Sequence, residues 1–184
     1  FLFAPVLGNQ SDRFGRRPVL IIGLTVLGID YVIMALAPNI WWLLIGRTMS
    51  GIAAATFTTA NAYIADVTTP EDRAKSYGLL GAAWGMGFML GPVLGGLVAD
   101  FADSARAPFY LAACLAFANA AYGFMLLPES LSPDKRRAFD IKRANTIGAI
   151  RMVAKHPGLL GLLIAMVFYQ IGHDANPAIW SFYT

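Results

Sequence analysis

Long apolar stretches alternate with short polar connections along most of the chain. Each long stretch has near or above the roughly 20 residues that a helix needs to cross a bilayer. A shorter apolar run, residues 1–7, looks cut off at the start of the chain. The pattern predicts an all-α fold, a polytopic bundle of transmembrane helices. The expected spans lie at about 18–37, 41–65, 75–99, 108–127 and 158–183.

The composition agrees with a membrane protein and limits its chemistry. Of the 184 residues, 57% are hydrophobic and 14% charged, and the mean hydropathy is +0.57, which is too apolar for an ordinary soluble domain. The chain begins at Phe1 with no basic segment before the apolar run, so we interpret it as a fragment that ends at Thr184, at or near the end of another span. The only cysteine, Cys114, excludes an internal disulfide and a cysteine metal cluster, and we expect it to be a small buried apolar residue.

Basic residues gather in every second connection. Of the 14 Lys and Arg, three lie in 8–18, two in 66–76 and seven in 129–157, whereas Arg106 is alone in the alternate loops. This is the positive-inside pattern, which predicts that the three basic connections are cytoplasmic. Because topology explains the basic clusters, no nucleic-acid partner is expected.

The apolar segment 78–96, GLLGAAWGMGFMLGPVLGG, carries glycines at fixed offsets. Gly87, Gly91 and Gly95 are four residues apart, so on a helix they share one face and leave a groove where another backbone can approach closely. Pro92 removes one backbone donor and favours a bend. We therefore expect a bent helix with a tight helix interface, as a moving membrane protein needs.

The connection 8–18, GNQSDRFGRRP, places one acid and three arginines between two spans. Gly8 and Gly15 permit a tight backbone, and Pro18 suits the first turn of the following helix. Asp12 is an anion able to face a helix N-terminus. The residues alone also fit a topogenic loop whose arginines only hold it in the cytoplasm.

Two charges lie inside spans, where each costs about 2.5–3.5 kcal/mol at mid-helix on insertion scales. With a rise of about 1.5 Å per residue, Asp30 lies about 10 Å and Arg47 about 9 Å from the outer ends of their spans. Because the two opposite charges lie at equal depth on consecutive antiparallel helices, each can offset the cost of burying the other in the membrane. Two interpretations stay open: a purely structural ion pair or hydrogen-bonded arginine, and a functional role in which Asp30 is a titrating acid or a ligand contact.

Other polar side chains lie where contact with lipid is costly, so we expect them to face protein or water. Asn61 and Tyr63, in the inner part of 41–65, are weak candidates for ligand contacts. For the last span two interpretations stay open. It could be a kinked helix whose polar groups are satisfied within the protein, or a helix whose polar groups line a cavity. The candidate cavity-lining residues there are Gln170, His173, Asp174 and Trp180.

The connection 8–18 is similar to the signature loop between the second and third helices of major facilitator superfamily transporters. Segment 78–96 resembles the fifth-helix signature of that superfamily's proton-coupled drug exporters. Arg47 in GRTMSGI looks like the fourth-helix arginine motif, and the sequence around Asp30, the LPESL segment and the PAIWSFYT ending resemble the tetracycline-exporter branch. The matching loop positions are Gly8, Asp12, Arg13, Gly15, Arg16 and Arg17, and the fifth-helix positions are Gly78, Gly87, Gly91, Pro92, Gly95 and Gly96.

The resemblance implies a partial major facilitator superfamily fold that runs from late in helix 2 to helix 7 of a twelve-helix protein. Residues 1–128 would be the N-terminal six-helix bundle, without helix 1 and the start of helix 2. Residues 129–157 would be a cytoplasmic linker between two bundles, and residues 158–184 would be the first helix of the C-terminal bundle.

The resemblance also implies roles for charged residues. The signature loop would form a cytoplasmic gate in which Asp12, Arg16 and Asp66 stabilise the outward-open state. Charge placement independently puts Asp66 on the same side as Arg16. Arg47 would serve proton coupling, and Asp30 would be a titrating acid or a ligand contact, although the third helix of this fold is usually peripheral to the cavity.

Residues and resemblance together predict a proton-coupled secondary transporter of a bacterial-type inner membrane, monomeric when complete. It would export small molecules such as tetracycline-like drugs by alternating access. No P-loop, metal cluster or nucleophile constellation is visible, so we expect no enzyme activity, cofactor or metal. A proton-linked sugar or metabolite carrier is an alternative within transport. A non-transporting membrane sensor or scaffold on the same fold is the alternative from another class.

Overall fold

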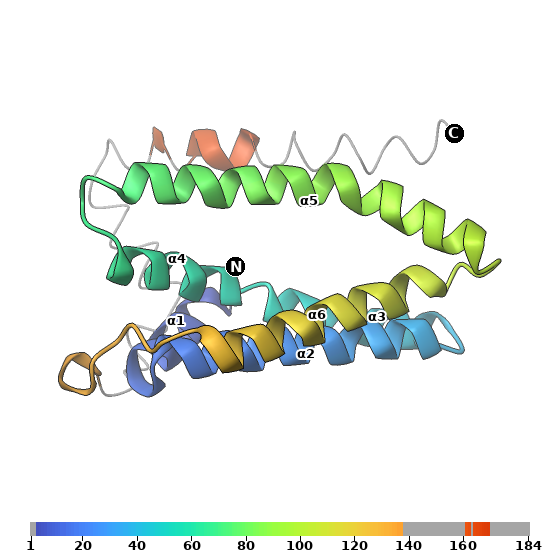
Figure 1. Cartoon of the computed structure of the whole chain (residues 1–184), viewed down its shortest axis with the longest axis horizontal. Helices are drawn as coiled ribbons and strands as arrows, with labels where there is room; N and C mark the ends of the chain where they lie inside the picture. The colour runs from blue at the N-terminus through green and yellow to red at the C-terminus, as the bar shows by residue number, and fades with distance from the viewer. Residues whose placement is uncertain (1–2, 138–160, 163, 170–184) are drawn as a thin grey trace. The chain divides into compact units, whose positions relative to one another are not determined.

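The computed structural model describes residues 3–137, 161–162 and 164–169, and no strand occurs among them. The predicted all-α fold is confirmed. The chain divides into two compact units, Phe1–Asp140 and Ile141–Thr184. In the second unit, residues 161–162 and 164–169 are helical. The first unit holds α1 (Ala4–Phe14), α2 (Arg16–Leu36), α3 (Ile40–Ala53), α4 (Thr56–Val67), α5 (Arg73–Phe101), α6 (Ala107–Leu126) and a short 3₁₀ helix, η1 (Pro133–Lys135) (Figure 1).

Four of the predicted spans in the first unit correspond to helices long and apolar enough to cross a membrane. The helices α2, α5 and α6 each form one uninterrupted span, whereas the predicted span 41–65 is divided into α3 and α4. At the division, the backbone tightens into a turn, since the N–H of Ala55 donates to the carbonyl of Ile52 at 3.1 Å. The division still leaves Ile40–Val67 as one candidate span.

The helix α2 is the centre of the first unit, because it packs against α6, α3, α4 and α1. It lies beside α6 in Figure 1, where small buried residues let the two backbones approach. A Cβ added to Gly28 would lie 2.7 Å from the ring of Phe117. The buried small residues of α6 are Ala113, Ala116, Ala120 and Gly123.

Large apolar side chains are exposed over much of the surface, as expected for helices that face lipid. The helix α5 is the extreme case, since it buries none of its residues and Trp84 is 66% exposed. Cys114 of α6 is exposed as well, so the expectation of a buried cysteine was wrong. A thiol is apolar enough to sit on a lipid-facing surface, so its residue type did not decide its burial.

The glycine face of α5 has little opposite it in the part of the chain that the structure describes. An added Cβ would meet no atom within 4 Å at Gly87 or Gly91, and at Gly95 it would meet only Pro108, at 3.9 Å. Pro92 lies inside the continuous helix, and Figure 1 shows α5 changing direction in the second half of its length. The expected groove is therefore present, and no described helix fills it.

Candidate functional site

The break between α1 and α2 is a single residue rather than an eleven-residue loop. The helix α1 continues to Phe14 and α2 begins at Arg16, so Gly8 lies inside a helix and the expected loop conformation at Gly8 was wrong. Gly15 alone makes the turn, with φ of +106°, a conformation that L side chains rarely adopt. Pro18 lies in the first turn of α2, where its missing N–H costs nothing.

Arg16 connects the ends of three helices. Its Nη1 lies 2.6 Å from Asp12 Oδ1, and its Nε lies 3.1 Å from Asp66 Oδ2 in the last turn of α4. Its Nη1 also donates to the hydroxyl of Ser11 at 2.6 Å. Only 11% of the Arg16 side chain is exposed, so these contacts are shielded from water more than an ordinary surface ion pair. The sequence did not indicate Ser11, which is fully buried.

Glu129, three residues after the end of α6, is a second member of this group of contacts that the sequence did not indicate. Its Oε1 accepts hydrogen bonds from the backbone N–H of Arg16 at 2.8 Å and of Leu131 at 3.1 Å. The first N–H groups of a helix have no partner within it and attract anions, so this carboxylate caps α2. A Cβ on Gly15 would lie 2.8 Å from the carboxylate carbon, so only glycine leaves room for the cap.

The start of the predicted linker therefore folds back onto the helix ends. The hydroxyl of Ser130 donates to Asp66 Oδ2 at 3.2 Å, and the backbone N–H of Arg137 donates to the carbonyl of Asp12 at 3.0 Å. We call the residues that meet here the Arg16 cluster: Ser11, Asp12, Arg16, Asp66, Glu129 and Ser130. A polar cavity of about 540 Å³ adjoins it, lined by Asp12, Arg16, Asp66, Leu131, Asp134, Arg136 and Arg137.

Two arginines of the signature loop do not join this cluster. Arg13 is exposed, with its guanidinium 5.0 Å from the ring centroid of Phe14. Arg17 lies on the α6 side, where its Nη2 donates to the carbonyl of Phe124 and its guanidinium lies 5.5 Å from the centroid of the Phe124 ring. The six loop positions thus make different contacts, and of the three loop arginines Arg16 is the one with ion pairs to carboxylates among the described residues.

The two intramembrane charges do not form an ion pair. Asp30 of α2 is completely buried, and neither of its carboxylate oxygens has a hydrogen-bond partner among the described residues. It packs against Gly46 of α3, where an added Cβ would lie 2.8 Å from Asp30 Oδ1. Arg47 is exposed, and both salt bridges of the described residues belong to Arg16. Gly46 rather than Arg47 packs against the acid, so the expected structural ion pair is absent among the described residues, although the charge of Arg47 still acts on Asp30 from beyond ion-pair distance.

Two of the remaining candidate residues, Asn61 and Tyr63, use their side-chain donors in hydrogen bonds within the protein. Asn61 Nδ2 donates to the carbonyl of Phe57 at 3.1 Å, and the Tyr63 hydroxyl donates to the carbonyl of Pro128 at 3.1 Å. Among the described residues, no group of three or more His, Cys, Asp or Glu is placed to hold a metal. The candidates that lie outside the described residues are Gln170, His173, Asp174 and Trp180.

Comparison with known proteins gives the family. The sequence profile of the Major Facilitator Superfamily matches residues 1–183. "Tetracycline resistance protein, class C" of Escherichia coli is 42% identical over 98% of this chain and 45% of its own length, and "Multidrug resistance protein 2" of Bacillus subtilis (strain 168) is 31% identical with the same coverage. The crystal structure of the human organic anion transporter MFSD10 (TETRAN) matches with a TM-score of 0.70 and 30% identity, over 79% of this chain and 34% of that one. The chain thus spans about half the length of the curated relatives it matches. It belongs to the major facilitator superfamily of multi-pass membrane transporters.

Proposed function

We propose that the complete protein is a proton-coupled secondary transporter that exports small molecules such as tetracycline-like drugs by alternating access. The observation that carries this proposal is Arg16, which bridges Asp12 and Asp66 across three helix ends. Relatives of the same family are named for tetracycline resistance, and the identity reaches 42% over nearly the whole chain. The alternating-access mechanism rests on two bundles that rock about a central site.

In this mechanism the Arg16 cluster is the gate on the cytoplasmic side. The signature loop is then a latch made of ion pairs and a helix cap, held by Arg16 and Glu129. Such contacts are strong enough to favour one state by a few kcal/mol and are still breakable during each cycle. The latch is closed when the protein is open to the outside.

Proton coupling is assigned to Asp30 and Arg47. A buried intramembrane acid without a hydrogen-bond partner is costly to keep and is a functional-site candidate by default. Arg47 follows Gly46, the residue that packs against the acid, and supplies a positive charge in the neighbouring helix. In the proposed cycle the acid takes up a proton as drug leaves, and Arg47 stabilises its charged form.

The glycine face of α5 is assigned to an interface with the other bundle. The groove is empty among the described residues, and its motif positions Gly78, Gly87, Gly91, Pro92, Gly95 and Gly96 lie along one helix. A close helix interface at this face limits leak of protons past the drug.

The proposal also includes the membrane topology and the domain boundaries of the chain. The connections 8–18, 66–76 and 129–157 are cytoplasmic, in the inner membrane of a bacterial-type cell. Residues 1–128 belong to the first bundle, 129–157 to the linker and 158–184 to the first helix of the second bundle. The complete protein works as a monomer.

The test is export of labelled tetracycline by the complete protein in inside-out vesicles. With an acidic lumen, protons leave as drug enters, so we expect accumulation that a protonophore collapses. Vesicles without the protein are the control for passive drug entry. Tetracycline flux that is carried by the protein and is the same with and without a pH gradient would contradict antiport, although a facilitated carrier would remain.

Replacing Asp30 with asparagine is expected to lower gradient-driven accumulation at least tenfold, because the amide does not carry a proton. Downhill exchange of labelled drug is expected to continue, since the side chain keeps its size and loses no hydrogen bond. The measurement compares accumulation and exchange in the same vesicles. Asp103→Asn, in the connection between α5 and α6, is the matched control. Accumulation at the unmodified level in Asp30→Asn would remove Asp30 from proton coupling.

A further inference from the structure

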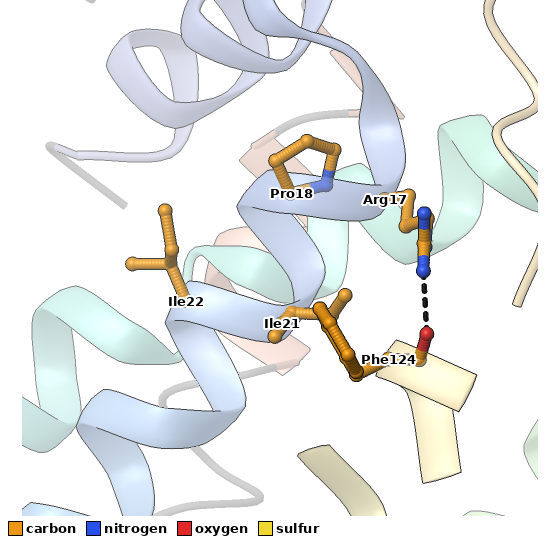
Figure 2. A pocket seen from close by; sticks show the side chains of 5 residues that line it. All are labelled: Arg17, Pro18, Ile21, Ile22 and Phe124. Carbon is orange, nitrogen blue, oxygen red and sulfur yellow. Dashed lines mark hydrogen bonds between the residues drawn. The ribbon is translucent and has the colours of Figure 1, made fainter. Parts of the chain in front are cut away.

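A small groove with a charged end lies on the α2 and α6 surface, apart from the Arg16 cluster. Arg17 and Pro18 come from the first turn of α2, Ile21 and Ile22 from the next turn, and Phe124 from the last turn of α6 (Figure 2). These five residues line a cavity of about 260 Å³. Ile22 is 62% and Phe124 64% exposed, so the groove is open to the surroundings of the helices.

The charged end of the groove has an unpaired cation. Arg17 donates from Nη2 to the carbonyl of Phe124, but its Nε is buried and has no hydrogen-bond partner in the part of the chain that the structure describes. A guanidinium has five N–H donors, so the donors of the two terminal nitrogens that the Phe124 carbonyl does not take stay available for an acceptor, whereas the buried Nε–H does not. No acid among the residues that the structure describes lines the groove, and Asp12 and Asp66 of the neighbouring cluster are bound to the Arg16 guanidinium. The groove therefore offers positive charge without a resident anion.

The position of the groove along α2 matches the depth profile of a bilayer. The 21 residues of α2 span about 32 Å, close to the roughly 30 Å hydrocarbon thickness of a membrane. An α2 that crosses the bilayer along this length places Arg17, at its end, at a membrane surface and places Ile21 and Ile22 one turn deeper. A cation at headgroup level with an apolar wall beneath it is complementary to a phospholipid.

We propose that this groove binds one anionic phospholipid of the adjacent leaflet. The lipid phosphate accepts hydrogen bonds from Arg17, and the first part of an acyl chain lies against Ile21, Ile22 and Phe124. The site requires only that α2 and α6 cross a bilayer, so it does not depend on the cargo or on proton coupling. Its charge is separate from the ion pairs of the gate, since Arg17 contacts α6 and Arg16 contacts α1 and α4.

The test is native mass spectrometry of the complete protein in detergent, titrated with phosphatidylglycerol or with phosphatidylcholine of the same acyl chains. One arginine near a membrane surface favours anionic lipid by about fivefold, so we expect that preference for the first phosphatidylglycerol bound. Arg17→Ala is expected to abolish the preference. Arg13→Ala is the matched control and should keep the preference, because Arg13 lies near the same helix ends but stacks on Phe14 and is not among the described residues that line this groove.

A second variant separates loss of the site from loss of folding. Ile22→Trp fills the groove from an exposed position and leaves Arg17 unchanged, so it should also lower the bound fraction of phosphatidylglycerol severalfold. Equal binding of the two lipids, or equal losses in Arg17→Ala and Arg13→Ala, would overturn the proposal. Displacement of the lipid by millimolar inorganic phosphate would overturn it too, since it would show a site for a free anion.

Discussion

Replacing Arg16 with alanine is expected to reduce drug accumulation in vesicles at least tenfold. The variant removes one cation from two carboxylates, Asp12 Oδ1 at 2.6 Å and Asp66 Oδ2 at 3.1 Å. Each hydrogen bond to a charged group contributes about 1.5–3 kcal/mol, and the carboxylates left behind repel each other. A loss of that size lowers the population of the latched state more than tenfold.

The design of the Arg16 experiment separates charge from geometry. Arg16→Lys keeps the positive charge, but an ammonium lacks the planar fork that reaches both acids, so an intermediate loss is expected. Arg13→Ala removes a cation from the same connection and leaves the cluster intact, so it should export normally. Equal export by Arg16→Ala and Arg13→Ala would show that the ion pairs do not hold a gate. A double-mutant cycle with Asp66→Asn then measures the coupling between the two partners.

The helical fold was predictable because a bilayer imposes one length on every span. The apolar runs 18–37, 75–99 and 108–127 agree with α2, α5 and α6 to within two residues at each end. The division of α3 from α4 was not predictable, because it lies at the alanine run 53–55, which contains no proline, and because the neighbouring Gly51 lies within α3 and does not end it. The loop conformation at Gly8 was wrong for the opposite reason, since glycine in a helix is permitted when neighbours support it.

The ion pair between Arg16 and Asp66 illustrates what charge placement can predict. The positive-inside pattern puts two helix ends on one side, and opposite charges at those ends are then free to meet. The same reasoning did not predict the absence of a direct ion pair between Asp30 and Arg47, because equal depth fixes the height of a residue and not its direction around the helix. Successive residues point about 100° apart, and Gly46 takes the position facing Asp30, so Arg47 acts on the acid without direct contact.

Glu129 escaped the sequence analysis because its partners are backbone N–H groups. Arg16 lies 113 positions earlier in the chain, and every residue except proline has an N–H, so no spacing or charge pattern marks the contact. The sequence held two signals for this contact: the acid Glu129 shortly after α6, and Gly15 immediately before α2. Neither is specific without the fold.

Glu129 provides the second large expected effect, since it holds the first turn of α2 and the start of the linker together. In Glu129→Ala the N–H groups of Arg16 and Leu131 lose their acceptor, which costs about 1–3 kcal/mol for each group left buried. We expect export to fall about tenfold and the thermal midpoint of the purified complete protein to drop. Glu71→Ala, an exposed acid in the connection between α4 and α5, should change neither.

Glu129→Gln distinguishes a hydrogen-bonding cap from a simple charge effect. The amide oxygen of glutamine still accepts both N–H groups, so the variant loses only the interaction of a negative charge with a helix N-terminus, about 0.3–1 kcal/mol. Export and thermal midpoint should therefore stay much closer to the unmodified protein than in Glu129→Ala. Gly15→Ala should reproduce the larger defect with Glu129 present, because its Cβ would meet the carboxylate and the residue must keep φ of +106°. Equal losses in Glu129→Gln and Glu129→Ala would contradict the capping role and leave net charge as the property that the gate needs.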